Sequence, residues 1–266
     1  MNRMESIRAV AAGLLVFLFA PGLLAAEPER AAAVLACASG NLPPAAKLRD
    51  FEIASTDANG GTRTLQGALY VAPLDDGYAL TLQVERPADM AGAAFLLRQG
   101  ADSEQMFVYL PAVRRMRRIT GQAANTSMFG SALRYSDIKA LQGGIASASS
   151  QWLGETEQDG RAGDRIALAW NSEQGTAESA VLEVDRQTCL IRAAQVSSNG
   201  KLVREFKTSP QHYVHADPHW YFSHAEMRDP ETGLVTTLSI REAKGYEDIP
   251  SRLFSPNQFH RARFDE

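Results

Sequence analysis

The feature that most constrains the fold of this chain is a long succession of short segments in which apolar residues recur at every second position. Residues 64–71 and 78–85 both follow this pattern, and an Asp-Asp-Gly turn at 75–77 separates them. A period of two is that of a β-strand with one buried face. Two such strands joined by a short polar turn predict an antiparallel hairpin.

The same pattern continues along most of the remaining chain, whereas helical periodicity is scarce. Only residues 28–38 and 136–141 suit short helices, and turns such as 198–201 and 229–233 separate several strand-like runs. The sequence therefore predicts a mainly β, α+β protein built on an antiparallel meander. The further predicted strands are 93–98, 105–110, 165–170, 179–184, 190–197, 202–208, 221–228 and 234–242.

A large sheet with one apolar face must bury that face against another layer, against itself as a barrel, or against a ligand. Because the chain has few helices, the pattern favours a curved sheet that closes around a cavity. A sandwich of two sheets whose apolar faces fill each other fits the alternation equally well.

The N-terminus has the pattern of a cleavable export signal. Arg3 and Arg8 precede the apolar run 9–24, and the small residues Ala25 and Ala26 follow it. The run is shorter than the ~20 residues that span a bilayer, which favours a signal peptide at 1–26 over a retained anchor. We therefore expect residues 27–266, which contain no linker-like tract, to form a single soluble periplasmic domain.

Cysteine content and charge agree with this location. Cys37 and Cys189 are the only cysteines, and two thiols in an oxidising compartment predict a disulfide, with two inert buried thiols as the alternative. The formal net charge of -4 argues against a general nucleic-acid-binding protein.

Residues 106–138 contain four motifs in a characteristic order. Phe107-Val108-Tyr109-Leu110-Pro111 leads into the basic run Arg114-Arg115-Met116-Arg117-Arg118-Ile119, then Met128-Phe129-Gly130-Ser131 and Tyr135-Ser136-Asp137-Ile138 follow. This order and spacing resemble the LolA-like family of outer-membrane lipoprotein-sorting proteins. The chain departs from the family in having Phe107 in place of the usual Trp, and Ala132 in place of an acidic residue after Gly-Ser.

The resemblance implies a curved, incomplete antiparallel β-barrel with short helices covering its concave apolar face. It also implies a non-catalytic carrier that shields the acyl chains of a lipid, a lipoprotein or a similar amphiphile, without a cofactor. The expected partners are that cargo together with an inner-membrane transporter of the RND type or an outer-membrane acceptor.

Three groups of residues are the candidate site of such a carrier. The arginines of the basic run are a headgroup or partner patch, although a solvated strand edge explains them as well. The segment 129–138 is expected to form a mobile lid with Met128, hinged at Gly130 and closed by an Asp137–Arg118 contact. The predicted cavity lining is Leu69, Val71, Leu80, Leu82, Val84, Phe95, Leu97, Phe107 and Tyr109; the lid is Met128, Phe129, Gly130, Ser131, Tyr135 and Asp137; the patch is Arg114, Arg115, Arg117 and Arg118.

A competing hypothesis is a metal-binding or enzymatic domain that uses the cluster His212, His215, Asp217, His219 and His224. Histidine and carboxylate are common transition-metal ligands, but this spacing matches no zinc signature and two prolines interrupt the segment. The sequence also lacks a nucleophile elbow, a phosphate-binding loop and a dinucleotide fingerprint. We therefore predict no catalytic residue and no metal.

Overall fold

The computed structural model describes residues 26–41, 46–100, 103–141, 149–171, 175–246 and 249–264. The predicted signal peptide lies outside these residues except for Ala26. The helices are α1, Ala26–Gly40, and α2, Tyr135–Leu141. The strands are β1 Ala46–Thr56, β2 Thr62–Leu74, β3 Gly77–Arg86, β4 Ala94–Gln99, β5 Glu104–Leu110, β6 Arg115–Ile119, β7 Ser149–Gln158, β8 Arg161–Asn171, β9 Ala177–Asp185, β10 Ile191–Ser198, β11 Lys201–Lys207, β12 Tyr213–Ala216, β13 His219–Phe222, β14 His224–Asp229, β15 Leu234–Ser239 and β16 Glu242–Gly245.

One antiparallel sheet contains every described strand except β12 and β13, which form a separate hairpin. The strand order is β6-β5-β4-β3-β2-β1-β15-β14-β11-β10-β9-β8-β7, and β16 pairs with the first part of β1. The chain thus runs outward from β1 to one edge, restarts at the other edge with β7, and returns to the middle. The predicted single meander is therefore corrected to two meanders, which meet where Ile53 of β1 lies opposite Leu238 of β15.

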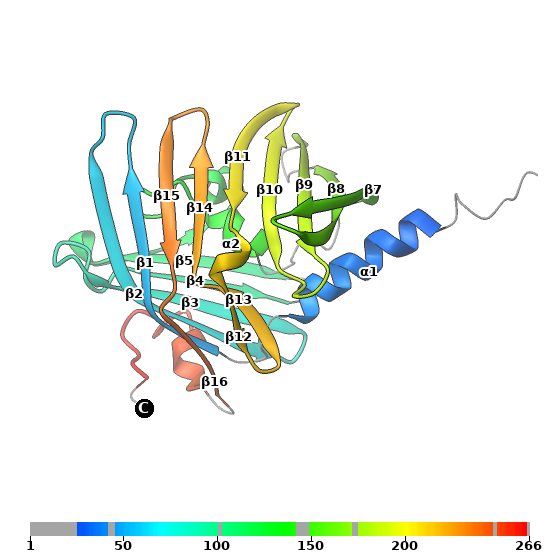
Figure 1. Ribbon diagram of the computed structural model, residues 1–266. Helices are drawn as coiled ribbons and strands as arrows, with labels where there is room; N and C mark the ends of the chain where they lie inside the picture. Colours follow the sequence, from blue (N-terminus) through cyan, green and yellow to red (C-terminus); the bar gives the residue numbers. More distant parts are fainter. Residues whose placement is uncertain are drawn as a thin grey trace, which may run out of the picture.

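The sheet curves strongly, so that β3, β4 and β5 run across the direction of β10, β11 and β14 (Figure 1). Register shifts in the β1–β2, β2–β3 and β7–β8 pairs mark bulges, which bend a sheet locally. Gly67 lies at one of them, where an added Cβ would be 1.9 Å from the Gln83 carbonyl oxygen. The edge strands β6 and β7 do not pair with each other. The predicted incomplete, curved barrel is confirmed.

The concave face carries the main hydrophobic core. Leu65, Leu82, Phe95 and Leu97 from the first strands meet Leu238 from β15 on this face. The segment Met128–Ile138, which includes the start of α2, packs onto these side chains, and we call it the plug. Figure 1 shows the β12–β13 hairpin over this side of the sheet.

The outer face of β2–β5 is covered as well, by the C-terminal residues 249–264. Leu253 and Phe259 are fully buried there against Tyr70 and Leu96. The side chains of Thr81, Gln83 and Arg98 donate hydrogen bonds to backbone carbonyls of this segment. The first half of the sheet is therefore buried on both faces.

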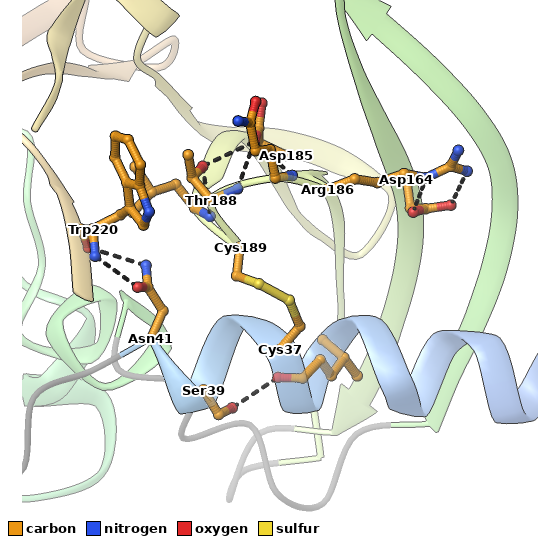
Figure 2. The surroundings of a disulfide bond; sticks show 12 residues. Cys37, Ser39, Asn41, Asp164, Asp185, Arg186, Thr188, Cys189 and Trp220 are labelled. Carbon is orange, nitrogen blue, oxygen red and sulfur yellow. Dashed lines mark hydrogen bonds and ion pairs between the residues drawn. A yellow bond between two sulfur atoms is a disulfide. The ribbon is translucent and has the colours of Figure 1, made fainter. Parts of the chain in front are cut away.

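The second half of the sheet is held in a different way. Ala31 of α1 packs against Ile166, Leu168, Ala180 and Leu182 of β8 and β9. The predicted disulfide between Cys37 of α1 and Cys189 in the β9–β10 turn is confirmed, with Cα atoms 5.4 Å apart. Figure 2 shows this bond joining α1 to the turn.

Candidate binding cavity

A cavity of about 280 Å³ lies on the concave side, between the sheet, the plug and the β12–β13 hairpin. Its volume is near the lower end of the range for small-molecule sites, ~300–1,000 Å³. Most of its wall is aliphatic or aromatic, and the charged members stand at the rim. The lining consists of Ala38, Asn41, Phe51, Leu69, Val71, Leu80, Leu82, Leu133, Ile138, Leu190, Ile191, Phe206, Ala216, Asp217, His219, Trp220, Tyr221, Phe222, Leu238, Ile240, Ala243, Lys244 and Gly245.

The wall formed by the sheet comes from the alternation seen in the sequence. Leu69 lies opposite Leu82, and Val71 lies opposite Leu80, in the β2–β3 register. These four predicted lining residues all border the cavity. Val84, Phe95 and Leu97 point to the same face but are covered within the core, next to the plug rather than beside the cavity.

The prediction that Phe107 and Tyr109 line the cavity is wrong. They lie on the outer face with the C-terminal segment, and the Tyr109 ring stacks on His260 with ring centroids 4.0 Å apart. Their neighbours Met106 and Val108 face the concave core instead. Strand β5 is covered on both faces, so the residues that point inward and those that point outward are both apolar. Periodicity alone therefore could not show which residues face the cavity.

The β12–β13 hairpin forms the cover of the cavity. Its second strand places Trp220, Tyr221 and Phe222 on the cavity wall. The Phe222 ring meets Phe206 of β11 with centroids 5.5 Å apart, and the Trp220 ring meets His215 at 4.6 Å. The hairpin therefore presents aromatic surface to the cavity, while Asp217 at its tip is exposed.

Asn41 joins this hairpin to α1. Its side-chain amide donates to the Trp220 carbonyl at 3.0 Å, and its side-chain oxygen accepts from the Trp220 backbone N–H at 2.8 Å. Figure 2 shows this pair beside the Cys37–Cys189 bond. The disulfide fixes the end of α1, and the end of α1 in turn holds the strand that covers the cavity.

The plug is packed as part of the core. Met128, Leu133 and Ser131 are almost fully buried, and the Ala132 backbone N–H donates to Thr236 Oγ1 of β15 at 2.8 Å. Phe129 and Gly130 have positive φ angles of 53° and 81°, which form the tight turn at its start. The lid was predicted because such a segment would have few buried contacts, and that premise is wrong. Its mobility remains a prediction.

Asp137 of the plug pairs with the second half of the sheet. Its carboxylate accepts from the Arg134 backbone N–H at 2.7 Å, as at the start of a capping-box helix, and lies 3.4 Å from Arg204 Nε. Burial raises the pKa of Asp137 to about 7, and the nearby carboxylates of Asp229 and Glu178 act in the same direction. The predicted contact with Arg118 is wrong, because Asp137 faces β11 and Arg118 lies on the opposite edge strand.

The four arginines of the predicted patch are exposed. Arg114 is the left-handed residue before β6, with φ 48°, and the others lie in β6 itself. None of them belongs to the cavity lining.

The histidine cluster does not converge. Among the described residues, no group of three or more His, Cys, Asp or Glu side chains is placed to hold a metal ion. His212 and His224 lie together at the base of the hairpin, with ring centroids 4.8 Å apart. His215 and Asp217 form a separate exposed pair at 3.9 Å, and His219 borders the cavity. The five residues therefore do not form the single metal site of the competing hypothesis.

Sequence reasoning missed the aromatic cover and its attachment. The run Trp220-Tyr221-Phe222 was a usable signal, since three aromatic residues in a short strand need an apolar surface to pack on. The role of Asn41 had no such signal, because a hydrogen bond between residues 41 and 220 depends on the tertiary fold.

A family model described only as an uncharacterized protein matches residues 78–261. The sequence matches no curated protein. Within the described residues, no helix is long and apolar enough to cross a membrane.

Three solved structures are similar over most of the chain. A domain described as an outer membrane lipoprotein-sorting protein from Vibrio parahaemolyticus has a TM-score of 0.78 and 17% identity, covering 88% of this chain and 100% of that one. A DUF1329 family protein from Desulfovibrio piger has a TM-score of 0.72 and 19% identity over 85% and 97%. A LolA superfamily protein from Nitrosomonas europaea has a TM-score of 0.63 and 15% identity over 85% and 97%. At these identities the similarities show the fold.

Proposed function

We propose that this chain, which belongs to the family whose model matches residues 78–261, is a LolA-like carrier that binds acyl chains in the concave cavity. The cargo is a lipid, a lipoprotein or a similar amphiphile, and binding involves no catalysis. One of the similar structures is described as a lipoprotein-sorting domain, which supports this cargo class.

The composition of the cavity wall carries the proposal. Side chains from β2, β3, β15, the plug and the hairpin meet there, and nearly all of them are apolar. Each acyl methylene transferred from water to such a wall contributes about 0.8 kcal/mol, so retention of cargo needs no reactive group. The polar residues Asp217, His219 and Lys244 lie at the rim, where a headgroup in contact with water would be placed.

The volume sets a condition on loading. About 280 Å³ is near the small end of ligand sites, so a bulky cargo needs the cover to move away from the sheet. The hairpin is the element whose displacement enlarges the cavity without breaking the main sheet, because β12 and β13 pair only with each other. We therefore assign entry of the acyl chain to the side covered by the hairpin.

Filling the cavity tests the proposal. Ala38→Trp adds an indole at a lining position of α1, and Ala36→Trp adds the same group at an exposed position of the same helix. We expect Ala38→Trp to weaken binding of a fluorescent fatty acid at least about tenfold, because the indole occupies space that the chain needs. Ala36→Trp should bind like the wild type.

The two variants also need equal thermal stability, so that loss of binding reports on the cavity. Equal binding by both variants, or no fatty-acid binding by the wild-type protein, contradicts the proposed function. Mass spectrometry of protein taken from its own host would identify the natural amphiphile.

The proposal includes export and transfer. The N-terminal pattern supports a cleavable signal at residues 1–26, and the Cys37–Cys189 disulfide fits an oxidising compartment such as the periplasm. An RND-type inner-membrane transporter and an outer-membrane acceptor are the partners proposed from the family resemblance.

A further inference from the structure

The strand β6 ends the sheet and leaves one backbone edge open. It pairs with β5 on one side, and no described strand pairs with the other side. An open edge presents a row of backbone donors and acceptors that another chain can use. Proteins that bind extended peptides by strand addition use such an edge.

The side chains along this edge are basic on both faces of the sheet. Arg117 lies opposite the inward-facing Val108, and Arg118 lies opposite the outward-facing Phe107. Arg115 shares the face of Arg117 because it is two positions away. Within the part of the chain that the structure describes, neither these residues nor Arg114 makes an ion pair.

Two apolar side chains accompany the arginines. Val113 is 63% exposed and Met116 is 38% exposed, and they are two of the three large apolar residues that the described chain leaves open to solvent. Exposed Val and Met side chains do not help a strand edge to prevent aggregation, because apolar surface favours contact with other chains. They suit a contact with a second polypeptide, since interfaces bury apolar residues at their centre and place charge around them.

The opposite edge strand, β7, is also unpaired on its outer side among the described strands and carries the third exposed apolar residue, Leu153, but its charges differ. The acidic Glu155 of β7 already pairs with Arg30 of α1 at 3.0 Å and with Arg186 at 2.7 Å. Arg30 also lies over the Trp152 ring, 4.2 Å from its centroid. Glu155 of β7 is therefore engaged within the chain, whereas the arginines of β6 are available to a partner.

We propose that β6 is the docking strand for an extended, acidic segment of a partner protein, which adds to the sheet edge by backbone pairing. Carboxylates on both faces of the added strand would meet Arg115 and Arg117 on one side and Arg118 on the other. An anionic membrane is a less suitable partner, because a flat surface attracts cations that project in one direction. This docking site lies outside the cavity, so it does not depend on the proposed cargo.

The test uses the mature, oxidised protein and a labelled, proline-free peptide of about eight residues with glutamates on both faces. A second peptide has lysine in place of glutamate, and a third is N-methylated at alternate amides, which removes backbone donors. We expect the acidic peptide to bind, with affinity that falls as salt rises. The lysine peptide should not bind, and N-methylation should weaken binding about tenfold or more.

A matched pair of variants locates the site. Arg115→Gln with Arg117→Gln should weaken peptide binding by about three- to tenfold, as expected for two exposed charges. Arg228→Gln with Arg241→Gln removes the same charge from exposed positions elsewhere and should leave binding unchanged. Both double variants should take up the fluorescent fatty acid normally, which separates a failure of docking from a failure of the cavity.

Three outcomes would overturn the proposal. Equal binding of the N-methylated peptide would show charge attraction without strand addition. Equal loss in both double variants would place the interaction elsewhere. Arginine-dependent binding to phosphatidylglycerol vesicles without binding to the peptide would make this edge a membrane contact.

Discussion

The two halves of the sheet are stabilised by different interactions. Strands β2–β5 are covered by the plug on the concave face and by residues 249–264 on the outer face. Strands β7–β10 pack on a single helix, and their stability depends on a disulfide and on buried ion pairs. The first half can therefore supply a rigid cavity wall, while the second half holds the helix that positions the cover.

The ion pairs of the second half join buried carboxylates to arginines that are partly exposed. Asp164 accepts from Arg186 Nε at 2.7 Å, from Arg30 at 3.0 Å and from the Trp152 indole at 2.8 Å. The hydrogen bond from Arg186 is the largest of the effects that lower the pKa of Asp164, to about 2. The carboxylate of Asp185 is also fully buried and is bound by Arg161 and Thr188.

The largest expected effect is that of removing the disulfide. Cys37→Ser with Cys189→Ser opens a loop whose ends are 152 residues apart, which in the chain-entropy model costs about 5 kcal/mol of unfolding free energy. Urea unfolding under oxidising conditions measures this loss. Hydrogen exchange should show earlier opening of β7–β10 and of the β12–β13 hairpin than of β2–β4.

Equal loss of protection from hydrogen exchange in every strand of this variant would contradict the difference in stabilisation between the two halves. That result would make the sheet one cooperative unit. The double substitution avoids leaving a free thiol that could form bonds between molecules.

Sequence patterning predicted the first half better than the second. Leu69, Leu80 and Leu82 alternate in strands whose inner face is plainly apolar, so their side of the sheet could be assigned. In β5 both faces are apolar and covered, and Phe107 and Tyr109 were assigned to the wrong one. Strand β1 was not predicted, although it joins the two meanders.

The next largest effect is expected in the C-terminal segment. Phe259 is fully buried on the outer face of β2–β5, and Phe259→Ala should cost about 3–5 kcal/mol, because it removes a large side chain from a covered core. Hydrogen exchange should then show the opposite pattern from the disulfide variant, with β2–β5 losing protection first. Phe259→Leu is the control, and its smaller cavity should cost less.

If Phe259→Ala lowered protection from hydrogen exchange only in β7–β10, the C-terminal segment 249–264 would not belong to the first half of the sheet. Fatty-acid binding adds a second measurement. The variant leaves the concave face untouched, so any protein that remains folded should bind with unchanged affinity.

The site was only partly predictable because much of it depends on pairings between distant segments. The aromatic cover follows two prolines and contains histidines, which directed attention to metal binding rather than to packing. The partner of Asp137 is Arg204, a buried arginine of β11 that the sequence does not distinguish from a surface residue. Burial of a charged side chain is decided by the whole fold, and local patterns do not encode it.

The smallest expected effect concerns pH and the two buried carboxylates. Asp137 in the plug has a pKa raised to about 7 by burial, whereas hydrogen bonds hold that of Asp164 at about 2. A raised carboxyl pKa means that the folded state binds a proton more tightly than the unfolded chain does, so stability falls as pH rises between about 4 and 7. The contribution of Asp164 is present above about pH 4 and is lost as pH falls toward 2.

Urea unfolding at pH 8 and pH 6 separates these two groups. The wild-type protein should gain about 1 kcal/mol on moving from pH 8 to pH 6, because Asp137 becomes protonated in the folded state over this interval. Asp137→Asn should lose this gain, since its amide does not titrate, and the difference from the wild-type protein isolates Asp137 from His260, whose pKa is lowered by burial. Asp164→Asn should be less stable at both pH values but should keep the same difference between them. An unchanged pH dependence in Asp137→Asn would mean that Arg204 keeps this carboxylate ionised in the folded protein.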